Sequence, residues 1–165
     1  LDIPHRLMEG YLVMAAEAVA QVPHTPTHIF LQAGVGGLAA AAAAYFRHAW
    51  GNEPAIIVVE PEIAPAIFQS ILAGKAINTP GPVSNMGRLD CKEPSLIALK
   101  GLARDADMFA LISDQAAEEA MPLLSSKGLE TTPSGGAGLV ALLNGFPEIN
   151  QNSRVLCIVS EESGS

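Results

Sequence analysis

The chain has 165 residues, 49% of them hydrophobic, and its 17 acidic and 9 basic side chains give a formal net charge of −8. This length suits one domain with its own core, the apolar fraction excludes general disorder, and the acidic balance excludes a nucleic-acid-binding surface. Two separated cysteines, no secretory leader and no apolar run of membrane-spanning length predict a soluble, cytoplasmic protein with no membrane partner.

Helix and strand patterns alternate along the chain. Helices are predicted where apolar residues recur at helical spacing, and strands where short runs of strand-forming residues end in glycine or polar residues. In chain order the expected elements are helix 3–22, strand 27–33, helix 37–50, strand 55–60, helix 62–73, helix 95–104, strand 108–112, helix 114–126, helix 138–143 and strand 155–160. This alternation predicts a three-layer α/β fold, in which helices cover both faces of a mostly parallel sheet.

One connection and the two ends of the chain depart from this regular pattern. Residues 78–90 are rich in glycine and proline and long for an α/β connection, which is typical of a functional or a disordered loop. The chain starts at Leu1 rather than at a methionine, and it stops at Ser165, shortly after a predicted interior strand. Residues 1–165 are therefore expected to be a single α/β domain that is a piece of a longer protein.

A glycine-rich loop joins the strand at 27–33 to the alanine-rich helix at 37–50. Three of the four residues at positions 34–37 are glycines, namely Gly34, Gly36 and Gly37. Ligands of a parallel sheet bind at the carboxyl ends of its strands, and a helix N-terminus favours an anion, so this loop is a candidate phosphate site. The alternative is a tight turn that binds nothing, although three glycines exceed what such a turn needs.

The same loop also matches the dinucleotide-binding fingerprint G-x-G-x-x-[GA], with Ala39 in the last position. Glu60, at the end of the next predicted strand, is the acidic residue that would bind a ribose hydroxyl in that case. The loop alone therefore does not separate a nicotinamide dinucleotide from a cofactor with a single phosphate.

Two further segments combine serine and glycine near the same predicted edge. Ser134 precedes the helix at 138–143, where capping the helix is favoured over ligand contact. Ser160 ends the last predicted strand, and both a turn residue and a ligand-binding residue are compatible with that place. The neighbouring Glu161 and Glu162 are expected to be solvated rather than to act as acid and base.

Other residue patterns do not indicate a catalytic or metal site. His24 and His28 are four residues apart, but prolines interrupt the segment, so no helix face presents them together and no metal is predicted. No Cys–His or Ser–His–Asp order is recognisable. A Schiff-base lysine is expected to be buried, whereas all four lysines of this chain lie in polar surroundings. They are Lys75, Lys92, Lys100 and Lys127. No catalytic residue is therefore assigned within this chain.

Seven short motifs follow one another along the chain. They are I-P-x-x-L-M-x-G-Y (3–11), P-T-H-I-F-L-Q-A-G-V-G (26–36), V-V-E-P-E (58–62), G-K-x-x-N (74–78), C-x-E-P-S (91–95), S-G-x-x-G-L (134–139) and a strand ending in Ser-Glu (160–161). In this order and spacing the chain resembles the pyridoxal-phosphate enzymes of the tryptophan synthase β group (fold type II) and, more narrowly, the diaminopropionate ammonia-lyases. The resemblance spans essentially the whole chain, and residues 32–36 are its most specific part.

This resemblance implies pyridoxal 5′-phosphate as the cofactor. Its phosphate would be held by the backbone N–H groups of Gly34, Val35, Gly36 and Gly37, and Ser160 would contact its pyridine nitrogen. The implied reaction is the α,β-elimination of 2,3-diaminopropionate, a small amino-acid substrate, to pyruvate and ammonia. The family likeness also implies a homodimer.

The chain also departs from the family pattern. The family's Schiff-base lysine lies upstream of every motif present here, so this fragment is expected to need the N-terminal part of the same enzyme and to be inactive alone. Pro133 replaces a glutamate, and residues 159–162 replace the family's S-T-E-G, which leaves the substrate open. The alternatives are another fold-type II enzyme such as a threonine or serine dehydratase, an NAD-binding Rossmann domain, and a non-catalytic α/β module.

Overall fold

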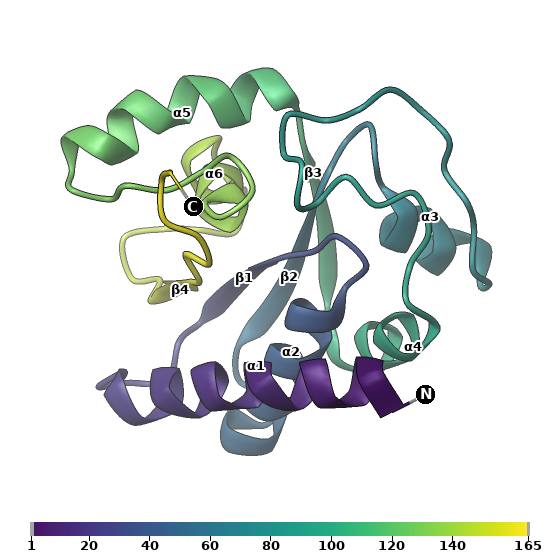
Figure 1. The fold of residues 1–165 in the computed structure, drawn as a ribbon. Coiled ribbons are helices and arrows are strands. Elements are labelled where there is room, and N and C mark those ends of the chain that lie inside the picture. Colours follow the sequence, from purple (N-terminus) through teal and green to yellow (C-terminus); the bar gives the residue numbers. More distant parts are fainter. Residues whose placement is uncertain (1, 165) are drawn as a thin grey trace.

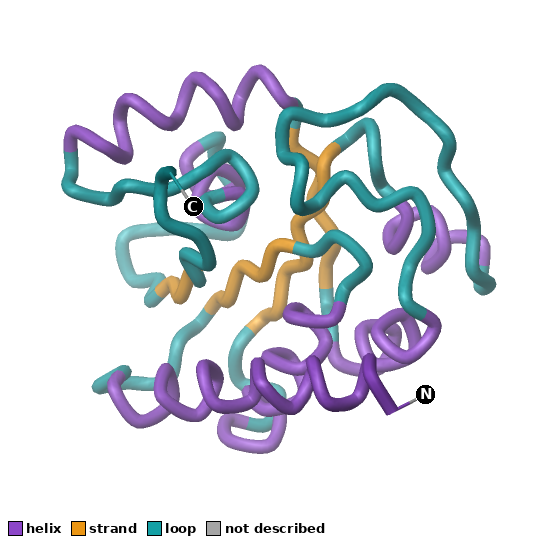
Figure 2. The backbone as a smooth tube through the Cα atoms, viewed as in Figure 1, coloured by secondary structure: helices purple, strands orange, loops and turns teal. Residues whose placement is uncertain are grey.

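Four parallel strands form the centre of the molecule (Figure 1 and Figure 2). The structure is a computed structural model that describes residues 2–164. The strand order is β3 (Met108–Ile112), β2 (Ala55–Pro61), β1 (His28–Gln32) and β4 (Val155–Cys157), and every neighbouring pair is parallel. This order and direction confirm the predicted α/β fold with its parallel sheet.

Helices cover both faces of the sheet, as Figure 1 shows. Those on one face are α1 (Asp2–Gln21), α2 (Gly37–Trp50), α3 (Ala66–Ala73) and α4 (Leu96–Asp105), and those on the other are α5 (Asp114–Ser126) and α6 (Ala137–Leu143). None of the helices within residues 2–164 has the length and apolar character that crossing a bilayer requires.

Successive residues of a strand supply the two halves of the core in alternation. In β1, Ile29 and Leu31 pack in the layer of α1, α2 and α4, whereas Phe30 packs in the layer of α5 and α6. The middle of β2 alternates in the same way, and these side chains are fully buried. A strand that is buried on both faces needs an unbroken apolar run, which is the pattern that predicted these strands.

Two predicted boundaries are wrong for identifiable reasons. The helix predicted at 62–73 begins only at Ala66, because the carboxylate of Glu60 accepts the N–H groups of Ile67 and Phe68 and so caps its first turn. The strand predicted at 155–160 ends at Cys157, because the next residues bond to a side chain and to a loop instead of to β1.

Candidate functional site

The carboxyl edge of the sheet borders a cavity of about 780 Å³. Its wall consists of residues 32–38 at the end of β1 and the start of α2, parts of the segment 88–95, residues 160–162 after β4, and one face of α1. The five predicted binding residues all line this one cavity: Gly34, Val35, Gly36, Gly37 and Ser160. Folding therefore joins the glycine loop to a serine from the far end of the chain.

The glycine loop before α2 leaves no room for a side chain at residues 34 and 36 and keeps its backbone donors open. Gly36 has a φ of +96°, and a Cβ atom on Gly34 would lie 2.8 Å from the carbonyl oxygen of Arg88. Within residues 2–164, no oxygen accepts a hydrogen bond from the N–H groups of residues 34–39. The N–H group of Val35 faces the thiol of Cys91. The first turn of α2 also carries no acidic side chain. Open N–H groups at a helix N-terminus fit the phosphate of a cofactor.

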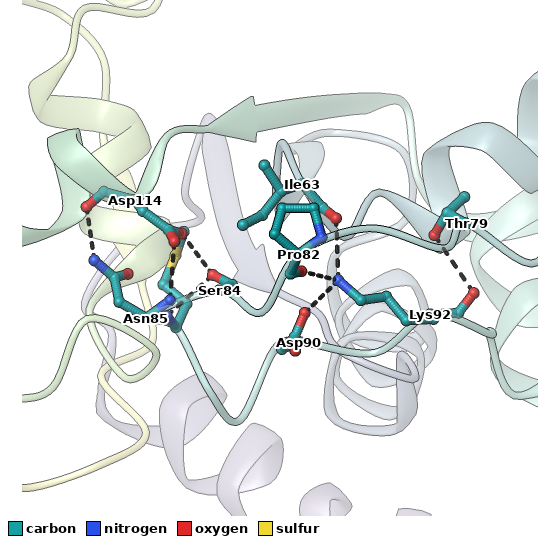
Figure 3. A network of polar contacts seen from close by, with 9 residues as sticks. Ile63, Thr79, Pro82, Ser84, Asn85, Asp90, Lys92 and Asp114 are labelled. Carbon is teal, nitrogen blue, oxygen red and sulfur yellow. Dashed lines mark hydrogen bonds and ion pairs between the residues drawn. The ribbon is translucent and has the colours of Figure 1, made fainter.

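The long loop between α3 and α4 packs against the glycine loop through residues 88–91. Polar contacts hold it in place (Figure 3). The ammonium group of Lys92 donates to the carbonyl oxygens of Ile63 (3.1 Å) and Pro82 (2.7 Å) and pairs with Asp90 (2.6 Å). In the middle of the loop, the carboxylate of Asp114 accepts from the hydroxyl of residue 84 and the N–H of residue 85. The segment is therefore ordered, and part of it reaches the cavity.

Ser134 has neither of the roles that its sequence position suggested. The N-cap of α6 is Gly136, which makes no side-chain capping bond, so the predicted capping by Ser134 is wrong. Its hydroxyl oxygen instead accepts the backbone N–H of Arg88 at 3.1 Å, and the residue is buried away from the cavity wall. Ser134 thus ties the α6 loop to the segment that packs against the glycine loop.

Gln32, the last residue of β1, is a site residue that the sequence reasoning missed. Its side-chain nitrogen Nε2 lies 2.8 Å from the Oγ of Ser160, 2.9 Å from the carbonyl oxygen of Gly135 and 3.0 Å from that of Ile158. Its sequence signals were an amide at the end of a largely apolar strand and a place in the motif at 26–36. The partners lie more than 100 residues away along the chain, so the sequence did not reveal them.

Charged groups of both signs line the cavity beside Ser160. The carboxylate of Glu161 accepts the hydroxyl of Thr132 and faces the Nε of Arg88 at 3.9 Å. The Glu161 side chain is 20% exposed and that of Arg88 is 73% exposed. The expectation that Glu161 is simply solvated is therefore wrong, because Thr132 holds it in the wall.

Glu60 does not serve a dinucleotide site. It is only 1% exposed, lies outside the cavity wall, and its two oxygens accept the N–H groups of Ile67 (2.8 Å) and Phe68 (2.7 Å). Burial raises the pKa of this carboxyl to about 7, against the lowering effect of those two hydrogen bonds. A ribose cannot reach this carboxylate, so the NAD-binding alternative loses the acidic residue that it required.

The residues that line the cavity include no lysine, no histidine and one cysteine. The ammonium of Lys92 is bound to the loop between α3 and α4. Cys91 lines the cavity, and burial raises the pKa of its thiol. Across residues 2–164, no three His, Cys, Asp or Glu side chains gather as a metal site would require.

Known proteins resemble this chain in sequence and in fold. Residues 4–161 match the family model described as pyridoxal-phosphate dependent enzyme. Diaminopropionate ammonia-lyase of Escherichia coli (strain K12) is 31% identical over 180 residues, which cover 96% of this chain and 45% of the relative. A crystal structure of the Escherichia coli diaminopropionate ammonia-lyase has a TM-score of 0.88 at 29% identity and covers 98% of this chain and 46% of its own. The threonine deaminase isoform 2 of Solanum lycopersicum, with a TM-score of 0.86, 20% identity and coverage of 94% and 46%, shares the fold.

The family match covers nearly the whole described chain, including the glycine loop and Ser160. The chain spans a little under half the length of the diaminopropionate ammonia-lyases it matches. The sequence match to this family and the open N–H groups at the N-terminus of α2 both indicate a site for a cofactor phosphate. The chain belongs to the family of pyridoxal-phosphate dependent enzymes.

Proposed function

We propose that this chain is the cofactor-phosphate-binding part of a pyridoxal-phosphate-dependent ammonia-lyase that converts 2,3-diaminopropionate to pyruvate and ammonia by α,β-elimination. The single observation that carries the proposal is the cavity that joins open N–H groups of the glycine loop to the hydroxyl of Ser160. The choice of reaction is supported by the relatives at 31% identity, which are diaminopropionate ammonia-lyases.

Within this proposal the cofactor lies along the cavity wall. The backbone N–H groups of Gly34, Val35, Gly36 and Gly37 would hold its phosphate, and the hydroxyl of Ser160 would meet its pyridine nitrogen; all five residues line the cavity. When bound, pyridoxal phosphate supplies the electron sink that makes removal of a proton from the α-carbon of an amino acid feasible. The protein's part is to hold the phosphate and to orient the ring.

The charges of the cavity suit a small substrate that carries both signs. Arg88 offers a guanidinium to a carboxylate, and Glu161, held by Thr132, offers a carboxylate to an ammonium group. A diamino acid carries one carboxylate and two amino groups. The arrangement is therefore compatible with 2,3-diaminopropionate.

The Schiff-base lysine is proposed to come from outside this chain. None of the cavity-lining residues is a lysine, and the ammonium of Lys92 is engaged by three oxygens. We therefore expect the isolated chain to be inactive. Treating it with pyridoxal phosphate and borohydride should give no stoichiometric reduction onto one lysine, and such a product would contradict the proposal.

The reaction itself is tested on the complete enzyme. We expect the highest kcat/KM for 2,3-diaminopropionate, measured as pyruvate release, with serine and threonine as competing substrates. A higher kcat/KM for serine or threonine would instead assign the protein to the dehydratases. A homodimeric state and a cytoplasmic location remain predictions.

A further inference from the structure

Gln32 is a buried amide whose orientation is fixed by its surroundings. The side chain is 2% exposed, lies at the carboxyl end of β1 and forms part of the cavity wall. The carbonyl oxygens of Gly135 and Ile158 both lie within hydrogen-bond distance of one end of the amide, at 2.9 and 3.0 Å. Because two carbonyl oxygens repel a third oxygen, the NH₂ group must occupy that end.

This orientation determines which partner donates in the contact with Ser160. The Nε2 atom of an amide has no lone pair to offer, so the hydroxyl of Ser160 cannot donate to it at 2.8 Å, and its Oγ shares the two Nε2 hydrogens with the two carbonyl oxygens as a third acceptor. The hydroxyl proton of Ser160 is then not used in this contact. Ser160 lines the cavity, so that proton is available to an acceptor inside it.

Gln32 also holds the backbone that carries Ser160. The pairing of β1 with β4 ends at Phe30 and Cys157, and beyond it Gln32 binds the carbonyl of Ile158 while the N–H of Ser160 donates to Gly135 at 3.2 Å. Glycine is needed on the facing segment, because a Cβ atom on residue 135 would lie 2.7 Å from the Cβ of residue 161. One amide thus replaces the next rung of the sheet.

We propose that Gln32 is a positioning residue that makes Ser160 a hydrogen-bond donor to the pyridine nitrogen of pyridoxal phosphate. It does so in two ways, by occupying the acceptor side of the hydroxyl and by fixing residues 158–160 against β1. This inference rests on the proposed function, since it needs the cofactor ring to lie at Ser160. It adds a residue whose effect on the cofactor is exerted through Ser160.

The test is a double-mutant cycle in the complete enzyme, with Gln32→Met, Ser160→Ala and the double variant. Methionine has a similar length and no donor. We expect each single variant to weaken pyridoxal phosphate affinity about tenfold, the loss for one hydrogen bond to a polar ligand, and to shift the absorption maximum of the bound cofactor. We expect the double variant to be no weaker than either single one. The control is Gln115→Met on the exposed face of α5, which should leave the affinity unchanged.

A second variant separates positioning from a loss of stability. In Gln32→Glu, an ionised carboxylate has no proton to donate and accepts the proton of Ser160, whereas a protonated one donates again. The affinity relative to wild type should therefore recover as the pH falls, whereas a defect caused only by the changed shape of the side chain would not follow its charge. The melting temperature of each apoprotein is measured alongside, so that all affinities refer to folded protein.

Two results would overturn the inference. One is an equal loss of affinity from Gln32→Met with and without the Ser160 hydroxyl, and the other is a pH-independent defect in Gln32→Glu. Failure of the proposed function has a different signature: the wild-type enzyme would bind no pyridoxal phosphate at all, or would bind it and show the higher kcat/KM for serine or threonine described above.

Discussion

The two edges of the sheet use their polar groups in opposite ways. At the amino edge, the guanidinium of Arg47 donates to the carbonyl oxygens of Asp105 (3.0 Å), Gly51 (3.1 Å) and Pro54 (2.8 Å) and pairs with Asp107. At the carboxyl edge, the N–H groups of residues 34–39 and the hydroxyl proton of Ser160 have no such oxygen partner within residues 2–164.

This difference separates the groups that hold the fold from the groups that recognise a ligand. The side chain of Arg47 is 14% exposed, and its hydrogen bonds link the two loops that precede β2 and β3. The donors around the glycine loop are left open because a helix begins there and no side chain caps it. Changes at the amino edge should therefore alter stability alone, and changes at the carboxyl edge should alter binding.

The largest effect on stability is expected from a change of pH, which titrates Glu60. This buried carboxyl group lies near the carboxyl edge, and both of its oxygens accept hydrogen bonds. The pKa of Glu60 is about 7 in the folded protein and 4.5 in an unfolded chain, so the folded state holds its proton longer. Its contribution to stability is full below pH 4.5 and is lost as the pH rises through 7, a total of about 3 kcal/mol. Urea unfolding between pH 4.5 and 8 should show this decline in wild type and a flatter profile in Glu60→Gln. Parallel profiles in the two proteins would contradict it.

Next in size is the loss of the clamp at the amino edge. Arg47→Met removes the donors from three carbonyl groups and leaves Asp107 without its cation, so the free energy of unfolding should fall by about 2–3 kcal/mol. Denaturant unfolding measures this loss. Pyridoxal phosphate affinity at the opposite edge should stay within about twofold, and a larger change would mean that the two edges are not independent.

A smaller loss of stability, joined to a loss of binding, is expected at the glycine loop. In Gly36→Ala the new Cβ would lie 2.8 Å from the Cδ1 of Ile67, at a φ of +96° that alanine rarely adopts. The cost is about 2 kcal/mol, and the loop should lose its ability to bind phosphate. The matched control is Gly87→Ala, where nothing lies within 4 Å. Unfolding and cofactor titration of both variants check this pair.

The smallest effect is expected at the charged mouth of the cavity. Because Arg88 is 73% exposed, its interaction with a substrate carboxylate is screened by water, and Arg88→Gln should raise KM only about threefold with kcat unchanged. Arg104→Gln, an equally exposed arginine on α4 outside this cavity, is the control. A fall in kcat without a change in KM would contradict a role in binding.

Much of the carboxyl edge could be predicted because its signals are local. The strand at 28–32, the glycine loop and the helix that begins at Gly37 follow one another in the sequence, so their order alone places a phosphate site at the edge of a parallel sheet. Ser160 was found because it follows a strand at the same edge, but its partner Gln32 was not.

The sequence by itself determined the alternation of helices and strands, the parallel sheet and the family motifs, since hydrophobic period and glycine spacing act over a few residues. Only the tertiary structure decided that Gln32 directs the hydroxyl of Ser160, that Ser134 binds the backbone of Arg88 and that Glu60 caps α3. These are choices among hydrogen-bond partners. A buried polar group takes whichever partner the packed chain brings within about 3 Å, and for the first two that partner lies on a distant segment.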